Sequence, residues 1–150
     1  MSLHSYSRCW LHMIWATKNR QKVLDKQARK MVSDHLSENA KEKDIYMKIN
    51  YVNADHVHSL IDLPTKYSIE DVAKLLTGEL SFWINQNDII PDKFSWGRGY
   101  GVFSVSHSIV AKVAEYIATQ EEHHKTMTFL EEYKDFVENY GLVWRDDENR

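Results

Sequence analysis

The stretch IYMKINYVNADHVHSLIDL at residues 45–63 decides the fold. Its two halves, Ile45–Asn53 and Val57–Leu63, are apolar and aromatic enough to form strands. Between them lies Asn53-Ala54-Asp55, in which the asparagine and the aspartate are residues that favour turns. We therefore expect two consecutive strands joined by a short turn.

Further elements are expected on both sides of this pair. Arg8–Thr17 (RCWLHMIWAT) and Gly99–Ser106 (GYGVFSVS) each have the composition of a strand. Asp25 and Ser68 can each cap a helix that carries apolar residues at helical spacing. The expected inward side chains are Ala28, Met31, Val32, His35 and Leu36 in the first helix, and Val72, Leu75, Leu76, Leu80, Trp83 and Ile84 in the second.

Two more helices are expected after the last strand. One begins at Ser106 or Ser108 and runs to about His124, and the other, with a possible capping box of Thr128 and Glu131, runs to about Tyr140. The order β-α-β-β-α-β followed by two helices predicts an α+β, ferredoxin-like fold, with an antiparallel sheet and helices on one face plus C-terminal helices. Many unrelated functions use this fold, so it says little about activity.

Length and composition limit the class of protein. With 150 residues, of which 43% are hydrophobic, the chain is expected to form a single domain over residues 1–150, with a core that needs no disulfide. The one cysteine, Cys9, excludes an intramolecular disulfide and fits a reducing cytosol. Met1–Ser7 is polar, unlike a signal peptide, and no apolar run approaches the roughly 20 residues of a membrane span. We expect a soluble, cytoplasmic protein.

The charges are unevenly distributed, although the net charge of −3 gives no hint of a nucleic-acid partner. Between residues 18 and 30 the only acidic residue is Asp25, and the region from Glu121 onward is strongly acidic. The basic residues of the first region are Lys18, Arg20, Lys22, Lys26, Arg29 and Lys30. Such a patch can bind phosphates, although the simpler interpretation of the charges is a solvated helix face.

His56-Val57-His58 is the sharpest local motif. Residues two apart on a strand point to the same face, so both imidazoles lie side by side and can begin a divalent metal site. A metal ion needs at least one further ligand, and histidine pairs are also common on solvated strand faces. By itself the motif therefore leaves both interpretations open.

The third helix offers groups that could complete such a site. Tyr116 and Gln120 lie one turn apart at the edge of its apolar stripe, and His123 continues the same line. Taken singly, this tyrosine would be a half-buried core residue and this glutamine a surface residue. Taken with His56 and His58, the two side chains could converge on one metal ion. A metal ion neutralises charge on a phosphodiester, and a tyrosine can be the covalent nucleophile.

With these residues, the chain resembles the single-tyrosine transposases of the HUH superfamily. It is most similar to the insertion-sequence-200-like group and its REP-associated tyrosine transposase relatives. The resemblance covers nearly the whole chain, in family order. The matching stretches are LHMIWATKNR at residues 11–20, DHVHSLI at 55–61, WGRGYGVFSVS at 96–106 and VAEYIATQEEHH at 113–124. His-hydrophobe-His followed by Tyr-x-x-x-Gln on a late helix is a specific combination.

The resemblance implies an activity and a site. Tyr116 would be the catalytic tyrosine, His56 and His58 the metal pair, and Gln120 the third protein ligand of Mg²⁺ or Mn²⁺. The reaction would be metal-dependent cleavage and rejoining of single-stranded DNA at element ends, through a covalent 5′-phosphotyrosine. The DNA would carry a small hairpin at each end. The resemblance also implies an obligate homodimer, in which the tyrosine helix of one subunit can serve the histidine pair of the other.

Two features depart from the family pattern. The protein is slightly acidic, whereas the family is usually basic, and His107, His123 and His124 are rivals of Gln120 as ligands. Candidate DNA contacts are Lys18, Arg20, Lys22 and Arg98. Trp15, Tyr100 and Phe103 could stack on unpaired bases, although core packing is the simpler expectation for Trp15 and Phe103.

Three alternatives stay open. A domesticated nuclease that processes chromosomal repeats would share the chemistry and differ only in its genomic surroundings. A non-catalytic module that binds single-stranded nucleic acid on its aromatic residues would bind equally well without metal. A metal hydrolase acting on a small phosphoester would use the histidine pair and would not need Tyr116.

Overall fold

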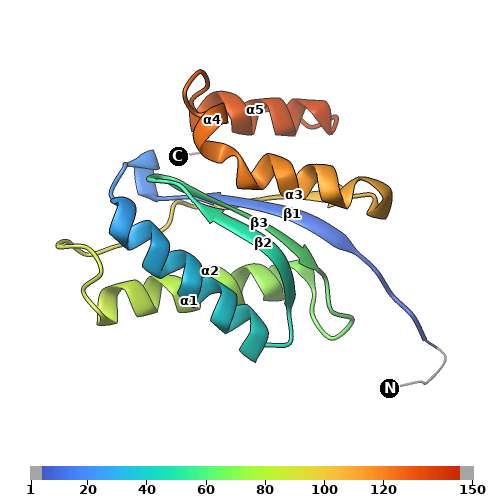
Figure 1. Ribbon diagram of the computed structural model, residues 1–150, viewed down its shortest axis with the longest axis horizontal. Coiled ribbons are helices and arrows are strands. Elements are labelled where there is room, and N and C mark those ends of the chain that lie inside the picture. The colour runs from blue at the N-terminus through green and yellow to red at the C-terminus, as the bar shows by residue number, and fades with distance from the viewer. Residues whose placement is uncertain (1–4, 146–150) are drawn as a thin grey trace.

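The computed structural model describes residues 5–145, which form one four-stranded sheet with helices on both faces (Figure 1). The strands are β1 (Trp10–Ala16), β2 (Tyr46–Val52), β3 (His56–Asp62) and β4 (Gly101–Val105). The helices are α1 (Lys26–Glu42), α2 (Ile69–Gln86), α3 (Val110–Ala118), α4 (Gln120–His123) and α5 (Phe129–Asn139), with short 3-10 turns η1 (Lys18–Arg20) and η2 (His107–Ile109). The element order and the α+β class confirm the ferredoxin-like prediction.

The sheet has the strand order β2-β3-β1-β4, and all three pairings are antiparallel. The expected turn joins β2 to β3, where the amide of Asn53 donates to the carbonyl of His56. On β3, His58 lies opposite Ile14 of β1 and Tyr51 of β2. Because β3 is hydrogen-bonded along both sides, it is a rigid base for the side chains that it carries.

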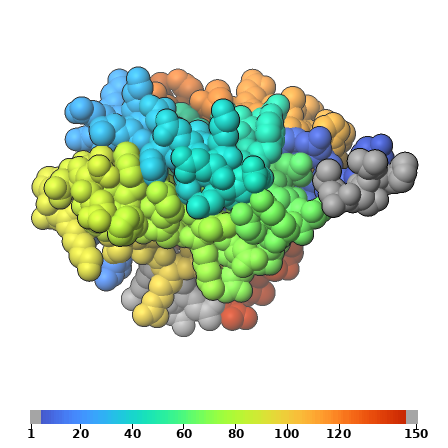
Figure 2. All heavy atoms as spheres, turned by 90° about the horizontal axis from the view of Figure 1, so that it is seen from below, coloured from blue at the N-terminus to red at the C-terminus, as the bar shows by residue number. Residues whose placement is uncertain are grey.

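Helices α1 and α2 cover one face of the sheet, as Figure 2 shows. Asp25 caps α1 by accepting a hydrogen bond from the amide of Ala28, and Ser68 forms a capping box with Asp71 at the start of α2. The predicted inward face is right for most positions but wrong for Met31, which is 41% exposed. Met31 lies at the edge of the stripe that buries Val32 and Asn39, so it reaches solvent.

The C-terminal helices α3, α4 and α5 cover the opposite face (Figure 1). The third helix, expected to run unbroken to about His124, is divided at Thr119 between α3 and α4. The Thr119 hydroxyl donates to the carbonyl of Glu115 one turn earlier, a bond that commonly bends helices. Neither Ser106 nor Ser108 caps α3 with its side chain, because η2 precedes it. The capping box of Thr128 and Glu131 is present at the start of α5.

The aromatic residues considered for base stacking divide into two groups. Trp15 and Phe103 are 2% and 3% exposed, so they are core residues, as the simpler expectation had it. Tyr100 is 38% exposed and is free to contact a ligand.

Within residues 5–145 no helix is both long enough and apolar enough to cross a membrane.

Candidate metal and tyrosine site

The two histidines of β3 point toward the C-terminal helices, whereas Val57 between them belongs to the core under α1 and α2. The side chains of His56 and His58 are 1% and 0% exposed. The alternative of two histidines on a solvated strand face is therefore wrong. Two buried imidazoles side by side need partners inside the protein.

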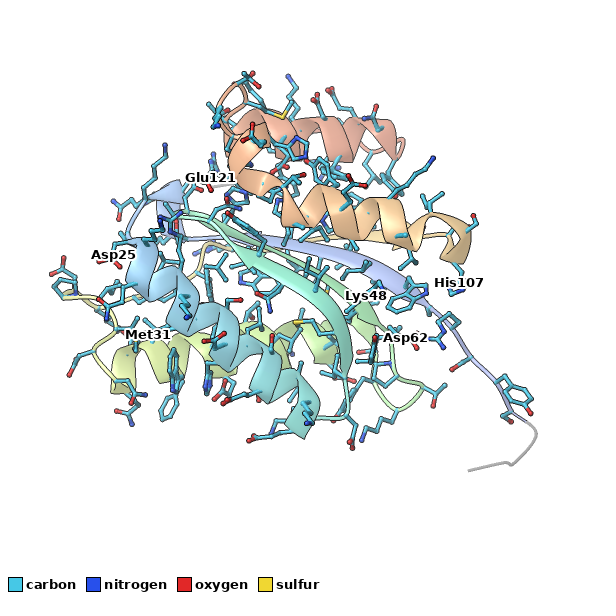
Figure 3. All side chains as sticks on the ribbon, in the orientation of Figure 1. Asp25, Met31, Lys48, Asp62, His107 and Glu121 are labelled. Carbon is cyan, nitrogen blue, oxygen red and sulfur yellow. The ribbon has the colours of Figure 1, made fainter. Side chains whose placement is uncertain are left out.

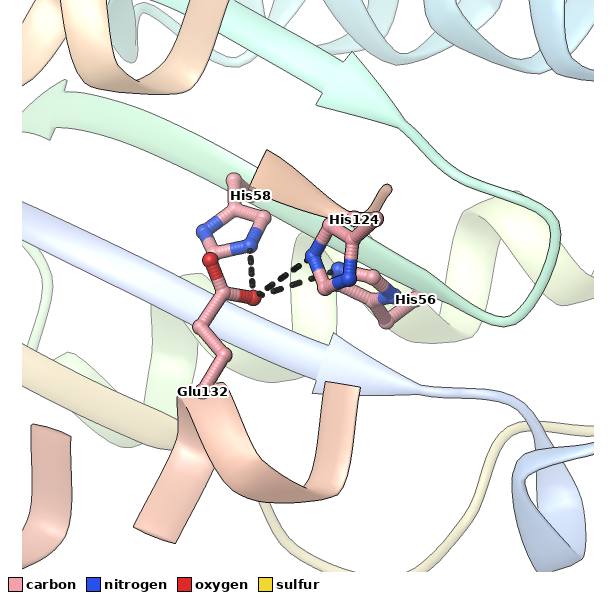
Figure 4. Close-up of side chains that lie close together, drawn as sticks. All are labelled: His56, His58, His124 and Glu132. Atoms are coloured by element: carbon pink, nitrogen blue, oxygen red, sulfur yellow. Dashed lines mark hydrogen bonds and ion pairs between the residues drawn. The ribbon is translucent and has the colours of Figure 1, made fainter. Parts of the chain in front are cut away.

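Those partners come from α4, α5 and the residue that follows α4. Figure 4 shows His56, His58 and His124 around the carboxylate of Glu132. The Glu132 Oε1 atom lies 3.0 Å from His58 Nε2, 3.1 Å from His124 Nε2 and 3.4 Å from His56 Nε2. One ligand atom from each of the four residues falls within 4.8 Å of the others, a group that could hold a metal ion.

Tyr116 and Gln120 meet the same carboxylate on its other oxygen. The Tyr116 hydroxyl donates to Glu132 Oε2, and Gln120 Nε2 donates to that atom at 3.2 Å. The Oε1 atom of Gln120 lies 3.1 Å from His124 Nε2 and accepts from the Asn53 amide at 3.3 Å. Gln120 is fully buried, so the expectation of a surface residue is wrong, while Tyr116 is half-buried as expected.

The three rival histidines occupy different places. His107 lies at the far end of the molecule from Glu121, as Figure 3 shows, where its Nδ1 atom accepts from the Trp10 indole at 3.0 Å. His123 stacks on the Tyr116 ring, with 4.4 Å between the ring centroids. Only His124 places a nitrogen in the cluster, and it does so beside Gln120 rather than in its place.

Each histidine of β3 has a second partner that fixes its ring. His56 Nδ1 lies 2.6 Å from an Asp55 carboxylate oxygen, and His58 Nδ1 lies 2.8 Å from Nε2 of His12 on β1. Metal-binding histidines usually use their other nitrogen in this way, because the bond sets the tautomer and the ring orientation. His58 Nε2 is thereby left facing Glu132, whereas His56 Nε2 lies 3.4 Å from Glu132 and 3.0 Å from the Asn53 amide nitrogen.

Burial and pairing shift the pKa values of these groups. Burial lowers the pKa of His58 to about 4, and burial together with the neighbouring His58 lowers the pKa of His12 to about 3. His56 differs, because bonds to Asp55 and Glu132 outweigh burial and raise its pKa. Burial acts to raise the pKa of Glu132, but hydrogen bonds with His124, His56 and His58 hold it well below its usual range. Burial, followed by the bond to Glu132, raises the pKa of Tyr116, so its hydroxyl stays protonated.

The metal-free protein is expected to lose stability as the pH falls from about 6.5 to 4. Unfolded His58 takes up a proton near pH 6.5, whereas the folded pKa is about 4, so acid favours the unfolded chain. A lowering from 6.5 to about 4 corresponds to on the order of 3 kcal/mol. His12 acts in the same direction, and the raised pKa of His56 offsets part of the loss. Thermal unfolding in EDTA measures this, and a melting temperature that is constant or rises on acidification would contradict it.

The donor atoms fit a divalent transition metal better than a hard cation. Imidazole nitrogens suit first-row transition metals, and the carboxylate and amide oxygens beside them suit Mn²⁺, whereas Mg²⁺ prefers oxygen ligands and retained waters. The buried carboxylate in contact with three histidine nitrogens is the observation that supports this fit. His56, His58, His124 and Glu132 could hold the ion, with the Gln120 oxygen beside them.

The four basic residues predicted to contact DNA line three hollows, two of which share Thr17. Lys22 lines a hollow of about 570 Å³ that also borders His56. Lys18 lines another, of about 510 Å³, with Phe94 and Ser95. Arg20 and Arg98 line a small third one beside Trp15.

Sequence reasoning missed Glu132 altogether and left His124 as one rival among three. The sequence contains a signal for Glu132, because this residue lies on the same face of α5 as three aromatic residues and a valine. These residues, spaced as one helix face, are Phe129, Tyr133, Phe136 and Val137. An acidic residue on an apolar stripe is usually buried for a specific purpose.

Comparison with known proteins identifies the family. The family model described as "Transposase IS200 like" matches residues 5–120. The transposase for insertion sequence element IS200 of Salmonella typhimurium is 28% identical over 127 residues, which cover 81% of this chain and 83% of that protein. The same values hold for the IS200 transposase of Salmonella typhi.

Solved structures agree in fold. The crystal structure of a protein assigned as a transposase, from Deinococcus radiodurans R1, has a TM-score of 0.64 and 25% identity, covering 80% of this chain and 96% of that chain. A REP-associated tyrosine transposase bound to a REP hairpin has a TM-score of 0.60, covering 83% of this chain and 74% of that one, and at 12% identity it supports the fold alone. The match to the family model over most of the chain shows that the protein belongs to the IS200-like transposase family.

Proposed function

We propose that this transposase cleaves and rejoins single-stranded DNA through a covalent bond between Tyr116 and a 5′-phosphate. The observation that carries the proposal is the convergence of the Tyr116 hydroxyl, the Gln120 amide and three histidine nitrogens on the two oxygens of one buried carboxylate. A tyrosine beside a cluster able to hold a metal ion is the arrangement that metal-assisted phosphoryl transfer needs.

In the proposed reaction the Tyr116 oxygen attacks the phosphorus of the scissile phosphodiester. The hydroxyl gives up its proton as a bond forms between phosphorus and the tyrosine oxygen, the bond to the 3′-oxygen breaks, and the departing oxygen takes up a proton, so that the strand leaves with a 3′-hydroxyl. A 3′-hydroxyl of another strand can attack the phosphotyrosine and reverse the step, so the phosphotyrosine conserves the bond energy. A divalent ion supplies neutralisation of the charge on the non-bridging phosphate oxygens.

The proposed ion is Mn²⁺ or Mg²⁺, and the donor atoms favour Mn²⁺. His56 and His58 would hold it, with the Gln120 oxygen, His124 and Glu132 as the groups near enough to add ligands. Within this one chain Tyr116 lies beside its own histidine pair, with 6.1 Å between the Tyr116 and His58 ring centroids. This proximity supports cleavage in cis, by the tyrosine and the histidine pair of the same chain.

The proposed substrate is single-stranded DNA with a hairpin at each element end, a proposal that rests on the family resemblance; a transposase of the same fold is bound to a REP hairpin. A homodimer and a cytoplasmic location are proposed on the family resemblance. A domesticated repeat-processing nuclease would use the same groups in the same way, and near-identical flanked copies in the genome would distinguish a mobile element from it.

The hollow beside His56 offers a route for the strand. Three cations, Lys22, Arg29 and Lys125, line it together with three carboxylates, those of Asp55, Glu121 and Glu131. The Arg29 Nε atom is buried and has no hydrogen-bond partner within residues 5–145. A guanidinium that lines the hollow next to the candidate metal cluster suits a phosphate of the flanking strand.

Arg29→Ala is therefore expected to weaken single-stranded DNA binding about tenfold, since a hydrogen bond to a charged group contributes about 1.5 kcal/mol. The dependence of affinity on salt should also become shallower. Lys30→Ala, an exposed cation next to it on α1, is the matched control and should have little effect. Fluorescence anisotropy at several salt concentrations measures both. Equal losses in the two variants would show that only net charge matters.

The covalent step is tested by incubating the protein with labelled single-stranded DNA and Mn²⁺, followed by a denaturing gel and mass mapping. The DNA should be the element's own end, taken from the sequence that flanks the gene. A nucleotide adduct on Tyr116 is expected. Tight binding that is the same with and without Mn²⁺, and that yields no adduct, would instead favour the non-catalytic binding module. Metal-dependent hydrolysis of a small phosphoester without Tyr116 would favour the hydrolase.

A further inference from the structure

Glu132, like His124, is a residue of the site that the family match does not reach, because that match ends at residue 120. It lies on α5, which packs over the tyrosine helix and the sheet, and only 1% of it is exposed. A carboxylate this deeply buried is costly to desolvate unless charges or hydrogen bonds compensate for it. Its five polar partners provide that compensation, and they are the groups of the proposed cleavage site.

The two oxygens of Glu132 face different parts of that site. Oε1 meets only histidine nitrogens, at 3.0 to 3.4 Å. Oε2 meets the Tyr116 hydroxyl and the Gln120 amide, both of which donate to it. One rigid carboxylate thus joins the metal-binding nitrogens to the nucleophile, and Figure 4 shows it reaching the histidines from α5.

Alternative partners for the tyrosine are poor. The rings around Tyr116 are those of His12, His58, His123 and Phe136, which contact it through ring faces and edges. Among residues 5–145 the hydroxyl donates to Glu132, and the Gln120 side chain is a further hydrogen-bond neighbour that itself donates to the same carboxylate oxygen. The orientation of the tyrosine oxygen therefore depends on this carboxylate.

We propose that Glu132 is a further residue of the cleavage site, which holds the Tyr116 oxygen in place through Oε2 and provides a metal ligand through Oε1. The role of Glu132 in holding Tyr116 rests on the proposed function, whereas its role as a metal ligand rests on the cluster alone. The proposal predicts that the C-terminal helix α5, beyond the part matched by the family model, is part of the active centre. Removing this helix would therefore remove activity as well as packing.

Two substitutions separate the role of Glu132 as a metal ligand from its role in holding Tyr116. Glu132→Gln keeps the shape and an oxygen that can accept from Tyr116, but it replaces the charged ligand by an amide. Glu132→Ala removes both contacts. Glu138→Gln, on the exposed side of the same helix, is the matched control. Each variant is tested for folding by circular dichroism, for Mn²⁺ affinity by calorimetry, for DNA affinity by anisotropy and for the adduct rate at saturating Mn²⁺ and DNA.

Glu132→Gln is expected to fold, to bind Mn²⁺ at least tenfold more weakly, and to form adduct within about tenfold of the wild-type rate once Mn²⁺ is saturating. Glu132→Ala, if folded, is expected to lose at least 100-fold in that rate. DNA affinity should change by less than twofold, because Glu132 is too buried to touch the strand. Glu138→Gln should match the wild type in all four measurements.

Unchanged Mn²⁺ affinity in Glu132→Gln would overturn the ligand role. A wild-type adduct rate in folded Glu132→Ala would overturn the role in holding the tyrosine. If the wild-type protein forms no adduct on Tyr116, the proposed function fails, and the calorimetric comparison alone then decides whether Glu132 is a ligand. The experiments thereby distinguish a failure of the proposed cleavage through Tyr116 from a failure of the proposed roles of Glu132.

Discussion

Tyr116→Phe is expected to abolish the covalent DNA adduct and strand cleavage, with at least a 1,000-fold loss of the cleavage rate. The substitution removes one oxygen, the only atom of this side chain that can attack phosphorus. It also removes the hydrogen bond to Glu132, at a cost of about 1 kcal/mol in folding stability. The ring keeps its contacts with His123 and Phe136, so the fold should persist. Adduct formation on denaturing gels, together with DNA affinity by anisotropy, measures the effect.

Tyr133→Phe is the matched control for that experiment. It removes the same atom from a partly buried tyrosine on α5 whose ring stacks on Phe129. The control should cleave DNA at the wild-type rate. Cleavage that survives in Tyr116→Phe would exclude Tyr116 as the nucleophile, and a matching loss of DNA binding would point to a role in holding the substrate.

The elements that local patterns determine were predicted from the sequence. The turn at Asn53–Asp55, the cap at Asp25 and the capping box at Thr128 involve residues a few positions apart, and each is present in the structure. The pairing of His56 with His58 follows from the two-residue repeat of a strand in the same way. Such features depend only on neighbours in the chain, so a single sequence contains the information.

What could not be predicted depends on how separate helices pack. Whether Tyr116 and Gln120 reach the histidines is decided by the position of α3 on the sheet, and the bend at Thr119 has no strong local signal. Glu132 is 74 residues from His58 in sequence yet 3.0 Å from it in space. No spacing rule relates two such residues. The position of His124, and not His107, beside His56 and His58 has the same origin.

The second large effect concerns the candidate metal site. Mn²⁺ is expected to stabilise the wild-type protein, because the cluster exists only in the folded chain and binding favours the state that binds. At a free Mn²⁺ concentration of 100 times the dissociation constant, the gain is about 2.7 kcal/mol, or roughly 5–10 °C in melting temperature for a domain of this size. In His56→Ala the dissociation constant should rise at least 100-fold and the Mn²⁺-dependent increase in melting temperature should disappear.

The metal-free His56→Ala protein separates a ligand from a packing residue. The imidazole stacks on Phe129 at 4.1 Å between ring centroids and bonds to Asp55, so its removal should cost about 1–3 kcal/mol even without metal. That loss leaves the protein folded at 25 °C and is independent of Mn²⁺. His107→Ala, at the far end of the molecule, should keep the full response to Mn²⁺. If His56→Ala unfolds in EDTA, or keeps the wild-type response to Mn²⁺, the histidine is a packing residue and the ion binds elsewhere. A stable variant that no longer responds to Mn²⁺ would instead identify His56 as a ligand, since packing alone gives no reason for the metal response to vanish.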